Sequence, residues 1–347
     1  MEEFTRVFVD TSKQIFQLHG VNAAEAPVLR RALRRGQVLE FFRRLGPVEI
    51  GLEACGASHY WARELSKLGH QVKLIAPQHV KAYVRRGKND AADAEAGCEA
   101  MSRPRTRFVP VKSAEQQAAL MLVSVRDRLV RSRTQLANAI RGHAAEFGLV
   151  AARGLDKIEP LLAAIAQDAT LPELARELFA GLGREWGRLQ GEVKALEARL
   201  LAWHRADQTS RRLAQIPSVG PIGACLLAMK TPDPKAFRSG RHFAAWIGLT
   251  PKDHSTAGRQ RLGGITRAGD EMLRATLVAG ATAVIRQVRA GKGPRSPWLL
   301  RLLQTKPPKL CAVALANKIA RIAWRMMLTA EDYDPTRLLR ALPQTTA

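Results

Sequence analysis

The sequence predicts a mixed α/β domain followed by mainly helical segments, and three observations support this fold class. Up to about residue 110, short apolar runs that suit strands alternate with stretches of helical periodicity. From about residue 112, apolar residues recur at helical spacing over long runs. The chain has 347 residues, which is enough for two or three domains. We therefore expect an α/β domain over residues 1–110, a helical coiled-coil arm over 111–207, a mainly helical domain over 208–330 and a loose tail over 331–347.

The expected elements of the α/β domain follow in chain order. Residues 6–21 predict a hairpin whose first strand ends at Asp10, and residues 27–43 are expected to be helical. The apolar run "VEIGLEA" (48–54) predicts a strand that ends near the carboxylate of Glu53. A helix through "SHYWARELSKLG" then stops at Gly69, and "QVKLIAP" (71–77) predicts a strand that ends at Pro77.

The remaining elements are expected to be helices and loops. One long helix is expected from about residue 112, a Pro/Gly break between about 148 and 160, and a second long helical run to about 205. This pair predicts an antiparallel arm or a dimer contact. In "IPSVGPIGA" (216–224), the pattern resembles the hairpin of helix-hairpin-helix DNA-binding modules, or it is a tight turn between two packed helices.

Composition favours a nucleic-acid partner. The chain carries 55 Lys and Arg against 31 Asp and Glu, a formal charge of +24, while 46% hydrophobic residues indicate a folded protein. Each phosphate that a protein neutralises releases counterions, which favours binding. An anionic membrane surface is the rival partner, but neither a run of 18 apolar residues nor a signal peptide occurs, so a cytoplasmic protein without a membrane partner is expected. The four scattered cysteines are expected to be reduced and buried.

Four acids of the first domain form a candidate metal site. Asp10 and Glu53 end predicted strands, and Asp90 and Asp93 lie three residues apart at a predicted helix start, on one helix face. Carboxylates in this number suit Mg²⁺ or Mn²⁺ bound to substrate phosphates. Each acid also has a structural explanation, since Asp90 suits a helix N-cap, Asp93 a first-turn acid, and the other two ordinary turns. The basic residues just before this helix are candidates for contact with the nucleic-acid backbone: Arg85, Arg86 and Lys88.

Longer stretches carry a family resemblance. "FVDTSKQIFQLHGV", "GLEACGASHYWARELSKLGHQVKLIAPQHVKAYV" and "KNDAADAEA" resemble the amino-terminal domain of the DEDD transposases of the IS110 insertion-sequence family, in particular its IS1111 branch. "IPSVGPIGA", "FAAWIGLTPK" and "RLGGITRAGDEMLRATL" are similar to the carboxy-terminal transposase domain of that family. The resemblance implies a first domain like RuvC and ribonuclease H, with Asp10, Glu53, Asp90 and Asp93 as metal ligands. It also implies a DNA recombinase that assembles as a homo-oligomer, dimer or tetramer, and is guided on donor and target DNA by a non-coding RNA that the element encodes.

The resemblance also implies a serine nucleophile in the second half of the chain. The equivalent stretch is "TPKDHSTAGRQRLGG", where the family register falls on Thr256, Ser255 stands one position earlier, and Ala257 replaces the usual glycine. We favour Ser255, because a primary hydroxyl is less hindered, and leave Thr256 as the alternative. The cations expected to hold phosphoryl oxygens around this loop are Lys252, Arg259, Arg261 and Arg267.

Two other functions fit parts of this pattern. A junction- or structure-selective nuclease like RuvC would use the four acids and metal-activated water, and would cut DNA without Ser255 or Thr256. A non-catalytic nucleic-acid-binding protein would carry the acids as structural residues, and would keep its function after Asp10→Asn.

Overall fold

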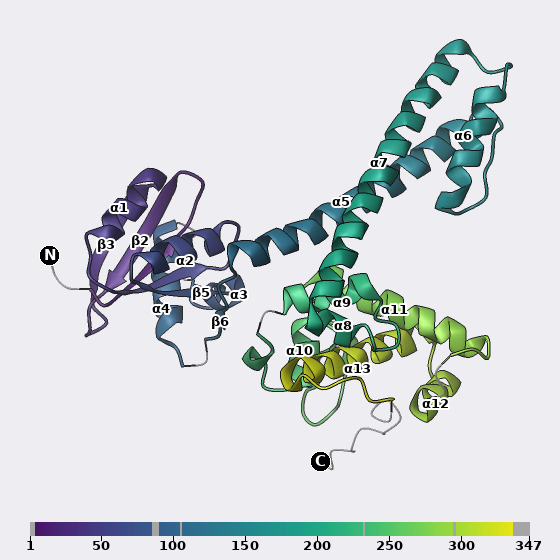
Figure 1. The fold of residues 1–347 in the computed structure, drawn as a ribbon. Coiled ribbons are helices and arrows are strands. Elements are labelled where there is room, and N and C mark those ends of the chain that lie inside the picture. The colour runs from purple at the N-terminus through teal and green to yellow at the C-terminus, as the bar shows by residue number, and fades with distance from the viewer. Residues whose placement is uncertain (1–3, 85–89, 105, 232, 294–295, 336–347) are drawn as a thin grey trace. The chain divides into compact units, whose positions relative to one another are not determined.

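The computed structural model describes residues 4–84, 90–104, 106–231, 233–293 and 296–335, and the side chains of Asp90 and Ala91 lie outside the described part. The chain divides into two compact units, Met1–Ala118 and Ala119–Ala347, which are considered one at a time (Figure 1).

The first unit is built on a six-stranded mixed sheet with the strand order β3-β2-β1-β4-β5-β6. Its strands are β1 (Arg6–Asp10), β2 (Ile15–Val21), β3 (Pro27–Arg34), β4 (Glu49–Glu53), β5 (Gln71–Ile75) and β6 (Phe108–Val109). β1, β4 and β5 are parallel neighbours, whereas β2 pairs antiparallel with both β1 and β3, and β6 pairs antiparallel with β5. The predicted hairpin over 6–21 and the two predicted strands that follow it are confirmed.

Helices cover both faces of this sheet. They are α1 (Val38–Arg43), α2 (Ser58–Lys67), α3 (Pro77–Lys81) and α4 (Asp90–Ser102), with a 3₁₀ turn η1 (Arg35–Gln37) before α1. Val7 and Val9 of β1 belong to a core shared with α1 and α2. Phe8, between them, belongs to a second core shared with α3 and α4. Since side chains alternate along a strand, Arg6, Phe8 and Asp10 share the α4 face of the sheet.

Two glycines bring α4 close to the sheet. A Cβ atom on Gly97 of α4 would lie 2.3 Å from Cε1 of Phe8, and a Cβ atom on Gly51 of β4 would lie 2.3 Å from Sδ of Met101. Phe8 and Met101 are buried, so neither neighbour has open space to move into. The helix therefore rests directly on β1 and β4, which contribute Asp10 and Glu53 at their ends.

The prediction of a helix over residues 27–43 is wrong for its first half. Residues 27–34 form β3, which pairs with β2 from Ile15↔Arg34 to Val21↔Pro27. Leu, Arg and Ala favour helices, but the ladder to β2 and the burial of Leu33 outweigh that local preference. The strand over 71–77 is also shorter than predicted, since β5 ends at Ile75 and Pro77 begins α3.

The long helices of the second unit are α5 (Ala114–Ala145), which begins within the first unit, and α7 (Glu173–Ala206), with η2 (Leu155–Lys157) and α6 (Ile158–Gln167) between them. Arg126 of α5 pairs with Glu197 of α7, and Arg133 donates to Gln190, so the two helices run antiparallel. A shared apolar core that includes Ile140 and Trp186 joins α5, α6 and α7. The predicted antiparallel pairing of two long helices is thus confirmed within one chain.

The rest of the second unit is a helical bundle that carries one small hairpin. Its elements are α8 (Gln208–Leu213), α9 (Pro221–Lys230), η3 (Pro234–Ala236), α10 (Gly240–Trp246), β7 (Pro251–Asp253), β8 (Leu262–Ile265), α11 (Glu271–Arg289), α12 (Pro297–Thr305) and α13 (Pro308–Thr329). α8 to α13 share one core, and residues 214–220 connect α8 to α9, which agrees with either a turn or a hairpin between two helices. Most of the predicted tail, residues 336–347, lies outside the described residues.

Two further expectations can be compared with the described residues. None of the helices described there is long and apolar enough to cross a membrane. All four cysteines are free, and three are buried as predicted, but Cys55 is exposed. Its Sγ lies 3.4 Å from Oγ1 of Thr11, beside the strand end that carries Glu53.

Candidate functional site

Asp10 and Glu53 lie side by side at one edge of the sheet. The parallel register of β1 and β4 runs from Arg6↔Glu49 to Val9↔Leu52, and one further residue places Asp10 beside Glu53. Neighbouring strands are about 4.8 Å apart, which brings the two carboxylates within reach of one ion. Both residues are partly exposed, and both share the α4 face with Phe8 and Gly51.

Asp93 lies on the helix that covers this face. It precedes Gly97 by four residues and therefore lies on the stripe of α4 that meets Phe8. Asp93 is partly buried. Asp90 begins α4, as predicted for a helix start, and its side chain lies outside the described part.

The donor set fits a hard cation in its chemistry. Carboxylate oxygens on one sheet face are ligands that Mg²⁺ and Mn²⁺ prefer. Among the side chains that the structure describes, however, no group of three or more acids, histidines or cysteines is positioned to hold a metal ion. The structure thus brings Asp10 and Glu53 together and places Asp93 on the facing helix, without completing a four-acid cluster.

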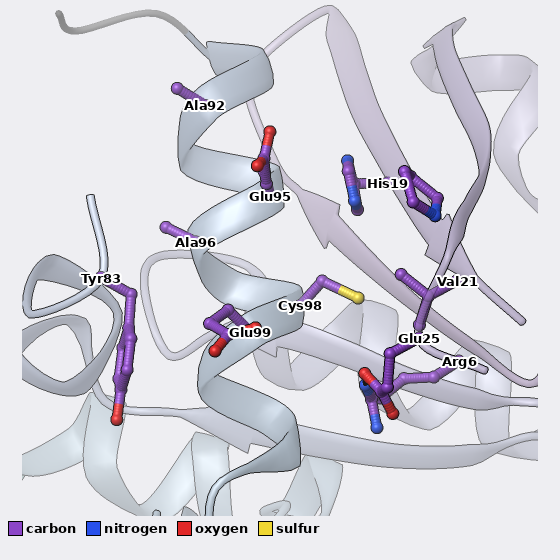
Figure 2. Close-up of a pocket in the computed structure, with 11 residues that line it drawn as sticks. Arg6, His19, Val21, Glu25, Tyr83, Ala92, Glu95, Ala96, Cys98 and Glu99 are labelled. Atoms are coloured by element: carbon purple, nitrogen blue, oxygen red, sulfur yellow. Dashed lines mark hydrogen bonds and ion pairs between the residues drawn. The ribbon is translucent and has the colours of Figure 1, made fainter. Parts of the chain in front are cut away.

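A pocket of about 360 Å³ lies between β1, β2 and the flank of α4 (Figure 2). Arg6 pairs with Glu25 on one side of it, and burial raises the pKa of the Cys98 thiol on the α4 side. His19 lies opposite Glu95, and burial lowers the pKa of His19. None of the three predicted acids whose side chains are described, Asp10, Glu53 and Asp93, lines this pocket, so it is distinct from the edge that carries Asp10 and Glu53.

The second predicted site is an exposed hairpin. β7 and β8 pair antiparallel, and residues 251–264 are all exposed. At the tip, the N–H of Thr256 donates to the carbonyl of Arg259 and the N–H of Arg259 donates to the carbonyl of Thr256, at 3.3 and 2.9 Å. Ala257 and Gly258 between them have φ values of +47° and +77°, as in the tight two-residue turns of hairpins.

Ser255 and Thr256 have different surroundings in this hairpin. The N–H of Ser255 donates to Oδ1 of Asp253 at 2.9 Å, and Oγ of Ser255 accepts from the N–H of Arg261 at 2.9 Å. A hydrogen bond to the Ser255 side chain, and then the one from its N–H, hold the pKa of Asp253 below its usual range. Ser255 therefore has an oriented hydroxyl, whereas Thr256 forms hydrogen bonds across the hairpin through its backbone.

Three of the four cations predicted around this loop lie in the hairpin. Lys252 lies on β7, Arg259 at the tip and Arg261 directly before β8, and all three are exposed. Arg267 lies beyond β8, where its N–H donates to the carbonyl of Gly248 at 3.2 Å. The three basic residues predicted before α4, namely Arg85, Arg86 and Lys88, lie outside the described residues.

Sequence reasoning missed two features of these sites. The first is Asp253, whose contact with Ser255 follows from the pattern Asp-X-Ser, a usual signal for a side-chain turn. The second is a row of arginines on β3, since residues 27–34 were expected to be helical. A strand assignment would have placed these arginines at the sheet edge.

Comparison with known proteins identifies the family of this chain. Residues 7–147 match a family of DEDD transposases of the IS110 type, described as "Transposase". Residues 210–293 match the family described as "Transposase IS116/IS110/IS902 family". The first match contains all four predicted acids, and the second contains the hairpin of Ser255.

Several relatives match along nearly the whole chain. The chain is 64% identical to a protein of Sinorhizobium fredii that carries the transposase designation y4pF/y4sB, over 96% of this chain and 86% of that protein. It is 38% identical to the transposase for insertion sequence element IS1328 of Yersinia enterocolitica, over 93% and 97% of the two chains. It is 36% identical to the transposase for insertion sequence element IS1111A of Coxiella burnetii, over 96% and 92%. The chain therefore belongs to the IS110 family of insertion-sequence transposases and is a DNA transposase.

Proposed function

We propose that this transposase cuts and rejoins DNA strands with two groups of residues: the acids Asp10, Glu53, Asp90 and Asp93, and a hydroxyl nucleophile at Ser255. The observation that carries the proposal is the placement of Asp10 and Glu53 on adjacent parallel strand ends, on the face that α4 and Asp93 cover. A divalent Mg²⁺ or Mn²⁺ ion held by these acids would stabilise charge on the attacking and leaving oxygens. The four carboxylates would hold that ion at the edge of the sheet.

The proposed nucleophile forms a covalent intermediate. Oγ of Ser255 attacks the phosphorus of a DNA phosphodiester, the bond from phosphorus to one sugar oxygen breaks, and that sugar leaves with a hydroxyl after protonation. The proton of Ser255 passes to solvent, while Asp253 orients the hydroxyl by its hydrogen bond. The exposed cations Lys252, Arg259 and Arg261 are suited to neutralise the phosphoryl oxygens. Attack by a sugar hydroxyl of another strand reverses the step and rejoins DNA without an external energy source.

A guide RNA would supply target choice. The formal charge of +24 favours long contacts with nucleic-acid backbones, and base pairing with an RNA can select a sequence that the protein does not read itself. We propose that the element encodes this RNA, and that two or more copies of the chain assemble on it with donor and target DNA. Sequencing the nucleic acid that copurifies with the protein, expressed with the DNA that flanks its gene, tests this. One discrete structured RNA from that flank supports guidance, and only heterogeneous host RNA and DNA contradicts it.

The catalytic proposal is tested by replacing the hydroxyls. Ser255→Ala is expected to abolish the covalent protein–DNA adduct that survives denaturation, and Thr256→Ala to retain it. If Thr256→Ala alone removes the adduct, Thr256 is the nucleophile. If a protein that carries both Ser255→Ala and Thr256→Ala still cuts DNA at the normal rate, water is the nucleophile and the enzyme is a metal-dependent nuclease.

Thr170 offers a matched control for this test. Its hydroxyl donates to Oδ1 of Asp168 at 2.6 Å and its N–H donates to the same oxygen at 2.9 Å, so it repeats the local geometry of Asp253 and Ser255. Thr170→Ala should leave the adduct unchanged. Asp10→Asn should abolish strand cleavage, and full cleavage by Asp10→Asn would contradict the role of the acids.

A further inference from the structure

The outer edge of the sheet in the first unit carries four arginines that the proposed chemistry does not use. β3 is the first strand in the sheet order, so among the described strands it pairs only with β2. Arg30, Arg31 and Arg34 lie on β3, Arg35 follows in η1, and all four are exposed. Residues 26–39 contain no Asp or Glu, and the acids nearest to this stretch are Glu25 before it and Glu40 after it. We call Arg30, Arg31, Arg34 and Arg35 the β3 arginines.

Two of the β3 arginines share the sheet face of Asp10. The pairs Asp10↔Gln17 and Gln17↔Ala32 form one row across β1, β2 and β3, and directly paired residues point to the same face. Ala32 is therefore about 10 Å from Asp10, two strand spacings away. Arg30 and Arg34 flank Ala32 at alternate positions of β3 and so lie on this same face. The contact of Arg30 with Glu95 of α4, at 3.6 Å, agrees with this orientation.

A groove connects these arginines with the row of Asp10. It has a volume of about 390 Å³, and its lining includes Gln17, His19, Arg30, Ala32, Ala92 and Glu95. Gln17 is the direct partner of Asp10, so the groove begins one strand from that acid. It shares His19, Ala92 and Glu95 with the pocket of Figure 2, where Glu95 of α4 lies across from His19 of β2.

The other two β3 arginines are held against aromatic rings on the opposite face. The guanidinium of Arg31 lies 5.3 Å from the ring centre of Phe41, and that of Arg35 lies 5.0 Å from the ring of Trp61. Stacking on a ring fixes the plane of a guanidinium and leaves its N–H edge available for a phosphate. Arg30 to Arg35 span about 16 Å along the edge, at roughly 3.3 Å per residue.

From this placement we infer that the β3 arginines bind the phosphate backbone of the DNA strand that enters the acid edge, with the strand passing from Asp10 over Gln17 to β3. DNA is the occupant because the groove begins one strand away from Asp10, where a DNA phosphate reacts under the proposed function, on which this inference rests. A DNA phosphate that binds Arg30 would displace Glu95 from it. The ion pair between Arg30 and Glu95 is weak, because the Glu95 side chain is 46% exposed to solvent. Arginines on an edge strand also discourage pairing with the sheets of other molecules. The test must therefore distinguish phosphate binding from this protection of the sheet edge.

The test measures the affinity of the full-length chain for a labelled single DNA strand over a range of salt concentrations. All proteins carry Asp10→Asn, and the measured quantity is binding and not cleavage, so failure of this inference can be told apart from failure of the proposed chemistry. Each phosphate contact on a single strand contributes about 0.7 to the slope of log affinity against log salt. Arg30→Gln with Arg34→Gln is therefore expected to reduce that slope by about 1.4. The lysine pair Arg30→Lys with Arg34→Lys should stay close to the parent.

A matched control lies at the end of α1 in the same unit. Arg43 and Arg44 are exposed and both pair with Glu40, so Arg43→Gln with Arg44→Gln removes the same charge and also leaves one carboxylate without its arginine. This control should keep the slope of the parent. Equal slopes for the β3 variant and the parent, or equal losses in both double variants, would overturn the inference. A loss confined to RNA of the same sequence would overturn the assignment to DNA, and aggregation of the β3 variant with an unchanged slope would assign the arginines to edge protection.

Discussion

At the scale of single residues, Ala257 occupies a position that suits glycine. Its φ of +47° lies in the left-handed region, which costs an L-residue with a Cβ atom about 1 kcal/mol. Ala257→Gly should therefore stabilise the closed hairpin tip by up to about 1 kcal/mol, or roughly fivefold in hydrogen-exchange protection of the Arg259 amide. Gly258→Ala, at φ +77°, should lower that protection. Faster exchange in Ala257→Gly would mean that the turn does not close as described.

His59 fixes the segment that leads into α5. Its Nδ1 accepts from the N–H of Lys112 at 3.1 Å, and Arg63 donates to the carbonyl of Lys112 at 2.8 Å. Burial, then the charges of Lys112 and Arg63, lower the pKa of His59 from 6.5 to about 4.

This pKa predicts a pH dependence of stability. Between pH 6.5 and about 4 the unfolded chain binds a proton at His59 that the folded chain does not, so the free energy of unfolding should fall as pH falls through this window. Above pH 6.5 His59 should contribute no pH dependence. Denaturant titrations of the wild type and His59→Gln should diverge only below pH 6.5, and parallel pH profiles would exclude this role for His59.

At the scale of elements, the contact of α4 with β1 decides where Asp93 lies. Gly97→Ala would place a Cβ atom 2.3 Å from the ring of buried Phe8, so α4 must shift. We expect a loss of about 1–3 kcal/mol in the free energy of unfolding. Strand cleavage should fall further than this loss of folded protein explains, because Asp93 moves with the helix.

A glycine-to-alanine substitution on α7 is expected to stabilise the protein, in contrast to Gly97→Ala. Gly187 is exposed within the helix, and a Cβ atom there would meet no atom within 4 Å. Gly187→Ala should stabilise the protein by up to about 1 kcal/mol with unchanged cleavage. Chemical denaturation of both variants checks the pair, and a stable, fully active Gly97→Ala protein would show that α4 does not need this close contact.

Elements with one dominant periodicity were predicted from the sequence, and the element that depends on a distant partner was not. The β1–β2 hairpin has apolar residues at strand spacing, and α5 and α7 have them at helical spacing. β3 has good helix formers and becomes a strand because β2 offers it a ladder. That partner is visible only in the folded sheet.

At the scale of the whole molecule, metal should affect the stability of the fold as well as strand cleavage. If Asp10 and Glu53 hold Mg²⁺ or Mn²⁺, either ion should raise the midpoint of thermal unfolding of the wild type, since a ligand that binds only the folded state stabilises it. Chelation should abolish strand cleavage and leave DNA binding in place. The same stabilisation in the Asp10→Asn protein would mean that the ion binds elsewhere.

The sequence predicted the candidate sites unevenly. Asp10 and Glu53 could be paired in advance because parallel strand ends meet at one edge, a rule that needs no side-chain detail. The hydrogen bond between Asp253 and Ser255 could be identified only once the hairpin geometry was known. The division of the chain into three structured parts stays a prediction, since the structure separates two compact units. The guide RNA and the oligomer follow from the proposed function alone.

The first unit is continuous in sequence and ends at Ala118, well before the hairpin at residues 251–265. A ribosome that adds about 5–20 residues per second needs roughly seven to thirty seconds to pass from one to the other. During this interval the nascent chain already contains every strand of the large sheet and its arginine-lined edge, but it lacks the hydroxyl that would react. Under the proposed function, each new molecule therefore acquires its proposed DNA-binding unit before its proposed nucleophile, and the order of synthesis would separate capture of nucleic acid from strand breakage in time.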